Sequence, residues 1–183
     1  MFKEFLPTLE TQRLLLRKMT PNDAKDMYEY SSKREVTKYL SWTEHESEEY
    51  TRQYLKFLKS KYKKGEYLDW GITLKSTGKL IGTAGFTSLD QDNFKGEIGY
   101  VLNPEYSGNG YATEAVKAVL DYAFNNLCLN RIEARVMEGN LLSVKLLEKI
   151  GMTYEGKGEK ELFVKGEFKS ILHFSLLKER FKN

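Results

Sequence analysis

A glycine-rich segment carries the clearest chemical signal in this sequence. Residues 106–112 read Tyr-Ser-Gly-Asn-Gly-Tyr-Ala, after an apolar strand pattern that ends at Leu102 and before a helical pattern that begins at Tyr111. Glycines let a ligand approach the backbone closely, and the first turn of a helix has unpaired N–H groups at the positive end of its dipole. The segment therefore indicates either a phosphate or pyrophosphate site or a loop whose glycines only shape a turn.

Two common nucleotide motifs fit this segment poorly. A P-loop has Gly-Lys-Ser/Thr before its helix, whereas this sequence has Gly110-Tyr111-Ala112. A dinucleotide fingerprint has Gly or Ala at the position of Thr113, and the strand before this loop comes late in the chain, after several others. Support for an ATP or dinucleotide site is therefore weak.

The segments around the loop must position it, and their patterns predict a mixed sheet with helices. Alternating apolar residues predict strands at 12–18, 68–74, 80–89, 97–102, 131–136, 154–164 and 167–177. Helical spacing predicts helices that begin near Thr20 and Ser47 and others that cover 111–126 and 141–150. This order predicts an α/β fold with a mixed, mostly antiparallel sheet of about seven strands flanked by about four helices.

Two of the predicted helices have a clear apolar face. In helix 111–126 the face consists of Ala112, Ala115, Val116, Val119, Ala123 and Phe124. In the helix near Ser47 it consists of Tyr50, Tyr54, Phe57 and Leu58. Both faces are expected to pack on the protein core.

Length, composition and charge limit the class of protein. The 183 residues, 40% hydrophobic and 30% charged, predict a single domain over residues 1–183. The net charge of +3 is spread along the chain, which argues against direct nucleic-acid binding. No apolar run is long enough for a membrane helix, and residues 1–7 lack the apolar stretch of a secretory signal. Two histidines and the single Cys128 make a metal site and an intrachain disulfide unexpected, and a cytoplasmic setting is predicted.

Three segments occur together in one order, and their combination is distinctive. They are the strand 97–102, the loop Ser107–Ala112 followed by Thr113-Glu114-Ala115, and Asn140-x-x-Ser143 running into residues 147–152. Together they resemble the GNAT N-acetyltransferase superfamily, whose acyl-CoA-binding pattern is Gln/Arg-x-x-Gly-x-Gly/Ala. Ser107 stands where that pattern has Gln or Arg. The resemblance to the superfamily covers nearly the whole chain. Within the superfamily, residues 9–17, Leu-Glu-Thr-Gln-Arg-Leu-Leu-Leu-Arg, are similar to the ribosomal-protein N-terminal acetyltransferase (Rim-type) branch.

The resemblance implies a GNAT fold and an acetyl-CoA-dependent N-acetyltransferase. Such an enzyme transfers acetyl from acetyl-CoA to a primary amine by direct attack in a ternary complex, without a metal. The branch points to the N-terminal amine of a ribosomal or other protein as acceptor. The alternatives are a small-molecule amine, such as a polyamine, an aminoglycoside or an amino acid, and a non-catalytic acetyl-CoA-binding sensor. The protein is expected to be a monomer or a homodimer.

The resemblance also assigns roles along the strand and the loop. Glu97 stands where some members have a general base, although a carboxylate there could also face solvent at a sheet edge. Backbone groups of Tyr100, Val101 and Leu102 would hold the pantetheine arm, and N–H groups of this strand would stabilise the oxyanion. The pyrophosphate would be held by the loop, namely by Gly108, Asn109, Gly110, Tyr111, Ala112 and Thr113.

The helix that begins near residue 141 lacks one residue that many GNAT enzymes use. They have a tyrosine seven residues after the asparagine, and here that position is Leu147. Ser143 is therefore predicted to assist the leaving thiolate, although serine is also common at the start of a helix. By resemblance Asn140 contacts the pantetheine arm, and it could also cap this helix.

The stretch between the first two helices corresponds to part of the acceptor groove in this family. Tyr39 and Trp42 lie there and are predicted to contact the acceptor, although Trp42 could instead pack in the core. His45 lies nearby in the polar sequence Glu44-His45-Glu46 and is predicted to be solvated.

Overall fold

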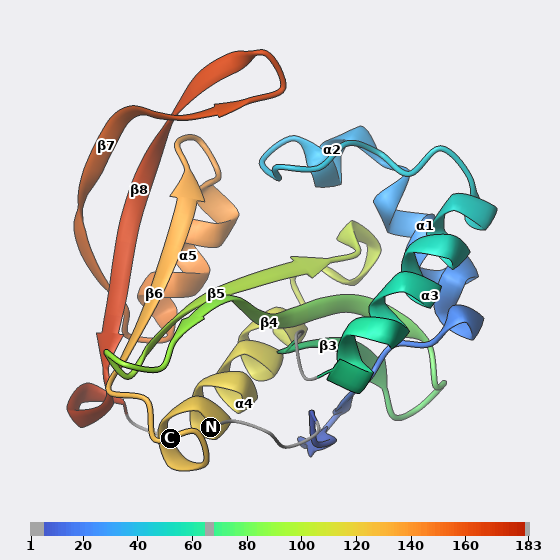
Figure 1. Cartoon of the computed structure of the whole chain (residues 1–183), viewed down its shortest axis with the longest axis horizontal. Helices are drawn as coiled ribbons and strands as arrows, with labels where there is room; N and C mark the ends of the chain where they lie inside the picture. Colours follow the sequence, from blue (N-terminus) through green and yellow to red (C-terminus); the bar gives the residue numbers. More distant parts are fainter. Residues whose placement is uncertain (1–5, 65–67, 182–183) are drawn as a thin grey trace.

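The computed structural model describes residues 6–64 and 68–181, so the prediction made from residues 1–7 lies largely outside the described part. Its central element is an eight-stranded sheet in the order β1-β2-β3-β4-β5-β6-β8-β7 (Figure 1). All neighbouring strands are antiparallel except β5 and β6, which are parallel. The strands are β1 (Leu9–Glu10), β2 (Leu14–Arg17), β3 (Leu68–Leu74), β4 (Leu80–Asp90), β5 (Lys95–Leu102), β6 (Arg131–Met137), β7 (Thr153–Val164) and β8 (Glu167–Leu177).

The described residues form five α-helices and three short 3₁₀ turns. The helices are α1 (Ala24–Ser31), α2 (Arg34–Thr37), α3 (Glu48–Lys64), α4 (Tyr111–Asn125) and α5 (Leu141–Lys149), and the turns are Pro21–Asp23, Pro104–Tyr106 and Lys178–Arg180. The predicted fold class is confirmed, with eight strands and five helices in place of seven and four. The added elements, β1 and α2, span two and four residues, too few for a sequence period to reveal them. Within the described segments, no helix is long and apolar enough to cross a membrane.

Helices cover both faces of the β2–β5 part of the sheet. Successive side chains of a strand point to opposite faces, and two neighbours on β3 show which helix covers which face. The ring of Trp70 contacts Tyr122 of α4, with ring centroids 5.5 Å apart. The side chain of its neighbour Asp69 points to the opposite face, beside residues of α1 and α3. Helices α1 and α3 therefore lie on one face and α4 on the other (Figure 1).

The apolar face predicted for α4 is nearly correct, whereas that of α3 is correct for Leu58 and Tyr54 only. Helix α4 buries Ala115, Val116, Val119, Leu120, Ala123 and Phe124 against the sheet. Helix α3 buries Thr51, Leu55, Leu58 and Tyr62, while Tyr50 and Phe57 remain 50% and 56% exposed. The buried face of α3 is therefore rotated from the aromatic stripe that the sequence suggested. Tyr50 and Phe57 do not pack in the core and remain available for other contacts.

Strands β5 and β6 separate after a short paired stretch. Their parallel pairing covers only Lys95, Gly96 and Glu97 of β5, opposite Arg131, Ile132 and Glu133 of β6. On its other side β5 remains paired to β4 as far as Leu102. From residue 98 to residue 102, the edge of β5 that faces β6 has no strand partner in the described chain, and Figure 1 shows the two strands diverging. This opening exposes backbone hydrogen-bonding groups that a ligand can pair with.

The long β7–β8 hairpin reaches back to the other half of the molecule. The ammonium of Lys165, in the hairpin turn, donates a hydrogen bond of 2.7 Å to the backbone oxygen of Thr37 at the end of α2. Beyond α2, the Tyr39 hydroxyl lies over Gly139, where a Cβ atom would be only 3.4 Å from it. These contacts join the two arms of the sheet across the gap between β5 and β6 (Figure 1).

Candidate active site

The glycine-rich loop presents its backbone openly at the start of α4. Gly108 and Gly110 have φ angles of +80° and +77°, in the left-handed region that favours glycine. Gly110 is the N-cap of α4, and a Cβ atom at Gly108 would meet no atom within 4 Å. The loop therefore leaves the first-turn N–H groups of α4 accessible, as a pyrophosphate requires.

A carboxylate of α4 ties this loop to the first strands. Glu114 Oε1 accepts hydrogen bonds from the Thr11 hydroxyl (2.6 Å) and the Arg13 backbone N–H (2.8 Å), and Oε2 accepts one from Arg13 Nε (2.7 Å). The same guanidinium donates to the backbone oxygen of Asn109 at 2.9 Å. Burial alone would raise the pKa of Glu114, but the hydrogen bonds from Thr11 and Arg13 outweigh it and lower that pKa. The loop is therefore held in place by an ionised Glu114.

Replacing Glu114 with glutamine is expected to weaken binding of acetyl-CoA by roughly tenfold or more, because a hydrogen bond to a charged group contributes about 1.5–3 kcal/mol. The glutamine cannot accept all of these bonds, so the loop loses its fixed position. Titration calorimetry with acetyl-CoA measures the effect. The control is Glu48→Gln, which removes a carboxylate that pairs with Arg52 within α3, on the opposite face of the sheet from the loop. Equal dissociation constants for Glu114→Gln and wild type would show that the loop does not depend on this contact.

Basic side chains surround a shallow hollow beside the loop. Arg13, Lys117 and Lys149 line it together with Gly110 and Thr113. Phosphate groups are favoured near lysine and arginine and near a helix N-terminus. The charge around the loop is therefore consistent with a phosphate-containing ligand, and the residues present fit coenzyme A.

The start of α5 brings three polar residues together next to β5. Asn140 Oδ1 accepts a hydrogen bond from the Ser143 backbone N–H at 3.3 Å, which makes Asn140 the N-cap of α5. The Ser143 hydroxyl lies 2.6 Å from the hydroxyl of Tyr100 on β5. Leu147, at the position of the missing tyrosine, is fully buried. A tyrosine hydroxyl thus reaches this site from the strand.

The side chain of Tyr100 is a functional candidate that was not predicted from the sequence. The sequence predicted a role for the Tyr100 backbone groups only. Burial raises the pKa of Tyr100 to about 12, and the hydrogen bond with Ser143 opposes this rise in part. The phenol therefore stays protonated near neutral pH and can donate a hydrogen bond. Alternation along β5 could have revealed this, since Ile98, Tyr100 and Leu102 share the face covered by α4.

Glu97 lies on the other face of β5, with Gly99 and Val101. Its carboxylate accepts a hydrogen bond of 2.7 Å from the hydroxyl of Thr87 on β4. Thr87 packs over Gly99, where a Cβ atom would be 2.8 Å from its methyl group. Thr87 lines the cavity described next, whereas Glu97 is not among the described lining residues.

A cavity of about 700 Å³ lies on the α1 and α3 face of the sheet. Its walls come from α1, residues 40–45, the start of α3 and strands β3 to β5. Trp42 lines it, as do backbone groups around Gly99 and Val101 where β5 leaves β6. Tyr39 is not among the described lining residues and lies against Gly139 instead. The cavity therefore meets the opening between β5 and β6.

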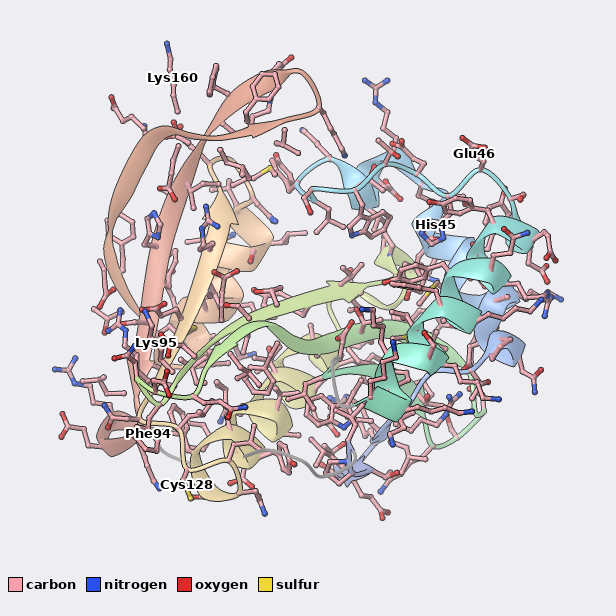
Figure 2. The ribbon with its side chains drawn as sticks, in the orientation of Figure 1. His45, Glu46, Phe94, Lys95, Cys128 and Lys160 are labelled. Atoms are coloured by element: carbon pink, nitrogen blue, oxygen red, sulfur yellow. The ribbon has the colours of Figure 1, made fainter. Side chains whose placement is uncertain are left out.

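The prediction that His45 is solvated is wrong. Its ring is half-buried in the cavity wall, and its centroid lies 5.5 Å from the rings of both Trp42 and Tyr54 and 5.0 Å from that of Tyr50. Figure 2 shows His45 inside the molecule while its neighbour Glu46 points outward. Nδ1 lies 2.8 Å from the Thr51 hydroxyl, and burial lowers the pKa of His45. Polar neighbours in the sequence suggested solvent, but the aromatic residues of α3 enclose the ring.

Comparison with known proteins identifies the family. A family model described as an acetyltransferase (GNAT) domain matches residues 13–153. The chain belongs to the GNAT acetyltransferase family. An uncharacterised N-acetyltransferase, p20 of Bacillus licheniformis, is 39% identical over 96% of this chain and 99% of its own length. A GNAT acetyltransferase structure from Bacillus anthracis has a TM-score of 0.84 at 31% identity and covers 94% of this chain and 99% of its own.

A more distant structure shares the fold of this acetyltransferase. It is described as RimL, a ribosomal L7/L12 alpha-N-protein acetyltransferase in complex with coenzyme A. Its TM-score is 0.78 at 17% identity, and the match covers 95% of this chain and 98% of that one. At this identity the likeness establishes the GNAT fold, and the acceptor of this acetyltransferase must be argued from its own residues.

The predicted site residues fall into two groups in this acetyltransferase. The loop 108–113, Asn140, Ser143 and Tyr100 lie toward the α4 and α5 face, where acetyl-CoA is expected. Glu97 and Trp42 lie on the α1 and α3 face, in or beside the cavity. Strand β5 separates the two groups and takes part in both. Their arrangement suits a reaction between ligands that meet at this strand.

Proposed function

We propose that this enzyme transfers an acetyl group from acetyl-CoA to a primary amine by direct attack in a ternary complex. The observation that carries the proposal is the opening between β5 and β6, which joins the acceptor cavity to the residues near the glycine-rich loop. Two ligands bound from opposite faces meet at residues 98–102. Positioning of this kind removes much of the entropic cost of a bimolecular step.

The residues expected to hold acetyl-CoA provide mostly backbone groups. The first turn of α4, at residues 111–113, supplies N–H donors for the pyrophosphate. The free edge of β5 supplies partners for the amides of the pantetheine arm, as a neighbouring strand would. Asn140 uses its side-chain oxygen to cap α5, which leaves its amide N–H groups for the same arm. When bound, acetyl-CoA supplies a thioester carbonyl, and N–H groups of β5 would stabilise the negative charge that develops on its oxygen.

The acceptor amine must lose a proton before it can attack, because an alkyl ammonium group such as that of lysine has a pKa of ~10.4. We propose Glu97 as the base. The Thr87 hydroxyl donates a hydrogen bond to the Glu97 carboxylate. When Glu97 takes this proton, the Thr87 oxygen can accept a proton from the ammonium in the cavity. This short relay connects the carboxylate to the acceptor.

The leaving thiolate needs a hydrogen bond or a proton. We propose that the Ser143 hydroxyl provides it, with Tyr100 as the partner that orients Ser143. The 2.6 Å contact between the two hydroxyls allows Tyr100 to donate to Ser143, which leaves the Ser143 proton for the thiolate. The tyrosine that many family members have on α5 is thus replaced by a serine from α5 and a tyrosine from β5.

Replacing Ser143 with alanine is expected to lower kcat about 5- to 150-fold, which corresponds to the loss of ~1–3 kcal/mol of transition-state stabilisation. The dissociation constant of acetyl-CoA should change little, because the pyrophosphate is held elsewhere. Tyr100→Phe, which removes only the partner hydroxyl, should lower kcat by a smaller factor. Steady-state kinetics on one good acceptor, with calorimetry for binding, measure both effects. An unchanged kcat for Ser143→Ala would limit Ser143 to a structural role at the helix start.

Two acceptor classes are supported by different observations. Residues 9–17 resemble the Rim-type branch, which favours the N-terminal amine of a protein, such as a ribosomal protein. The cavity of about 700 Å³, which is partly open to solvent, favours a small-molecule amine. Free-thiol release from acetyl-CoA, measured over a panel of both classes, tests the activity. Tight binding of acetyl-CoA without thiol release for any amine would instead indicate a sensor.

A further inference from the structure

The turn at the end of the β7–β8 hairpin holds a lysine in an unfavourable backbone conformation. Val164 pairs with Glu167, so the loop between the two strands consists of Lys165 and Gly166 alone. Their φ angles are +52° and +79°, both in the left-handed region. Two-residue loops of this kind favour asparagine, aspartate or glycine, because other L side chains are strained there. The turn itself therefore gives no reason for a lysine at position 165.

The side chain of Lys165 reaches a buried part of the other half of the molecule. Its ammonium donates a hydrogen bond of 2.7 Å to the backbone oxygen of Thr37, the last residue of α2, which is 0% exposed. The Thr37 hydroxyl in turn donates to Glu44 Oε1 at 2.7 Å. That hydrogen bond lowers the pKa of Glu44, and the charge of Lys165 adds to the effect. These three residues form a connected set, which we call the bridge.

The bridge holds a segment that lacks regular secondary structure. Residues 38–47 are all described, and none of them belongs to a helix or a strand. Residues 40–43 and His45 of this segment line the acceptor cavity. The backbone N–H of His45 donates to the Ser31 oxygen of α1 at 3.0 Å, which anchors one end of the segment. Trp42 lies between Thr37 and Glu44 in the sequence, so its position depends on the bridge.

The other side of the bridge belongs to the part of the molecule that carries Ser143. Strand β8 of the hairpin pairs with β6 along its whole length, and α5 begins shortly after β6 ends. A second contact joins the same two parts, because the Tyr39 hydroxyl lies against Gly139, the residue before Asn140. The bridge therefore sets the cavity wall against the start of α5, across the gap between β5 and β6 (Figure 1).

We propose, on the basis of the acetyltransferase function above, that Lys165 is a positioning residue for the acceptor. Its ammonium fixes the wall that carries Trp42 relative to the start of α5, so that an amine in the cavity is held at the thioester. Lys165 itself touches neither reactant. An asparagine would suit the turn better, but its short side chain would leave the Thr37 oxygen without this donor.

Three variants at position 165 test the proposal by steady-state kinetics. The acceptor is whichever of spermidine, 2-phenylethylamine and an unblocked pentapeptide wild type acetylates fastest. Lys165→Met, which removes the ammonium and keeps the length, should lower kcat/KM for this amine roughly 3- to 10-fold, mainly through KM. Lys165→Asn should lower it equally, and Lys165→Arg should stay within about twofold of wild type because it keeps a cationic donor. The dissociation constant of acetyl-CoA should not change in any variant.

Thermal unfolding separates this positioning role from a role in stability. Asparagine tolerates the left-handed region and methionine does not, so Lys165→Asn should melt about 2–4 °C above Lys165→Met. The two variants should nevertheless share the same kinetic defect. If kcat/KM instead follows the melting temperature, with the asparagine variant close to wild type, Lys165 acts only on stability. Wild-type kcat/KM in both variants would also refute the proposal.

Lys160 offers a matched control on the same hairpin. It has a φ of +48° in β7, and its ammonium has no partner among the described residues. Figure 2 shows its side chain pointing away from the molecule. Lys160→Asn should therefore raise the melting temperature by a similar amount and leave kcat/KM at the wild-type value. A loss of kcat/KM in this variant equal to that of Lys165→Asn would assign the effect to the hairpin backbone and overturn the role of the Lys165 ammonium.

Tryptophan quenching tests the position of the wall without any turnover. The sequence has two tryptophans, and Trp70 is 0% exposed, so quenching by acrylamide reports on Trp42. The quenching constant should rise in Lys165→Met and Lys165→Asn and stay at the wild-type value in Lys165→Arg and Lys160→Asn. An unchanged constant in all four variants would show that Lys165 does not hold the wall. If wild type releases thiol with no amine, the acetyltransferase function fails, while quenching still decides whether Lys165 fixes Trp42.

Discussion

Replacing Glu97 with glutamine is expected to lower kcat/KM for an amine acceptor by about 10²- to 10⁴-fold near neutral pH, the usual contribution of a main general base. Glutamine keeps the size of the side chain and can still bond to Thr87, so the geometry of β4 and β5 should persist. It cannot accept the proton of the ammonium. Raising the pH should partly restore the rate, because the free-amine fraction of the acceptor grows about tenfold per pH unit below its pKa.

The measurement is a pH profile of kcat/KM for wild type and Glu97→Gln on one acceptor. The matched control is Glu133→Gln, which changes the carboxylate that lies opposite Glu97 in the pairing of β5 with β6. Glu133 pairs with Arg131 on β6, so its removal should leave the profile close to wild type. Equal rates and superimposable profiles for Glu97→Gln and wild type would exclude Glu97 from the proton transfer.

Replacing Gly110 with valine is expected to weaken acetyl-CoA binding by about two orders of magnitude or more. A branched side chain at a φ of +77° is strained, and its methyl groups would cover the N–H groups that the pyrophosphate needs. Calorimetry with acetyl-CoA and with coenzyme A measures the loss. It should be similar for both ligands, because the acetyl group lies far along the molecule from the pyrophosphate.

Gly78 provides the control for backbone strain. It lies in the turn between β3 and β4 with a φ of +72°, and a Cβ atom there would meet no atom within 4 Å. Gly78→Val therefore imposes comparable strain away from the loop, and it should lower the melting temperature without changing the affinity for acetyl-CoA. Binding by Gly110→Val as tight as wild type would mean that the pyrophosphate is held elsewhere.

The sequence predicted the elements whose signals are local. The face of α4, the strands 154–164 and 167–177, and the glycine loop before α4 all depend on spacing within a few residues, and their bounds agree with the structure within one or two positions. The strand opening was not predictable in this way. Where β5 parts from β6 depends on the register between segments more than thirty residues apart, and neither strand changes its own pattern there.

The acceptor side was the part that the sequence described least well. Tyr50 and Tyr54 have helical spacing and were predicted to belong to one apolar stripe, but α3 buries Thr51 and Leu55, leaves Tyr54 partly buried and leaves Tyr50 exposed. His45 has charged neighbours in the sequence and aromatic neighbours in space. A cavity wall is built from apolar residues just as a core is, and periodicity alone cannot tell the two apart. Trp42 could be suggested only by resemblance to the family.

The placement of the acceptor cavity and the glycine-rich loop on opposite faces of the sheet affects the order in which substrates come and go. With acetyl-CoA at the loop and the amine in the cavity, as proposed above, neither ligand would block the exit of the other, and a random order of binding is expected. A fresh amine can therefore enter while spent coenzyme A is still bound. That unproductive complex would trap part of the enzyme, so inhibition by excess amine follows from the same architecture that brings the two reactants together.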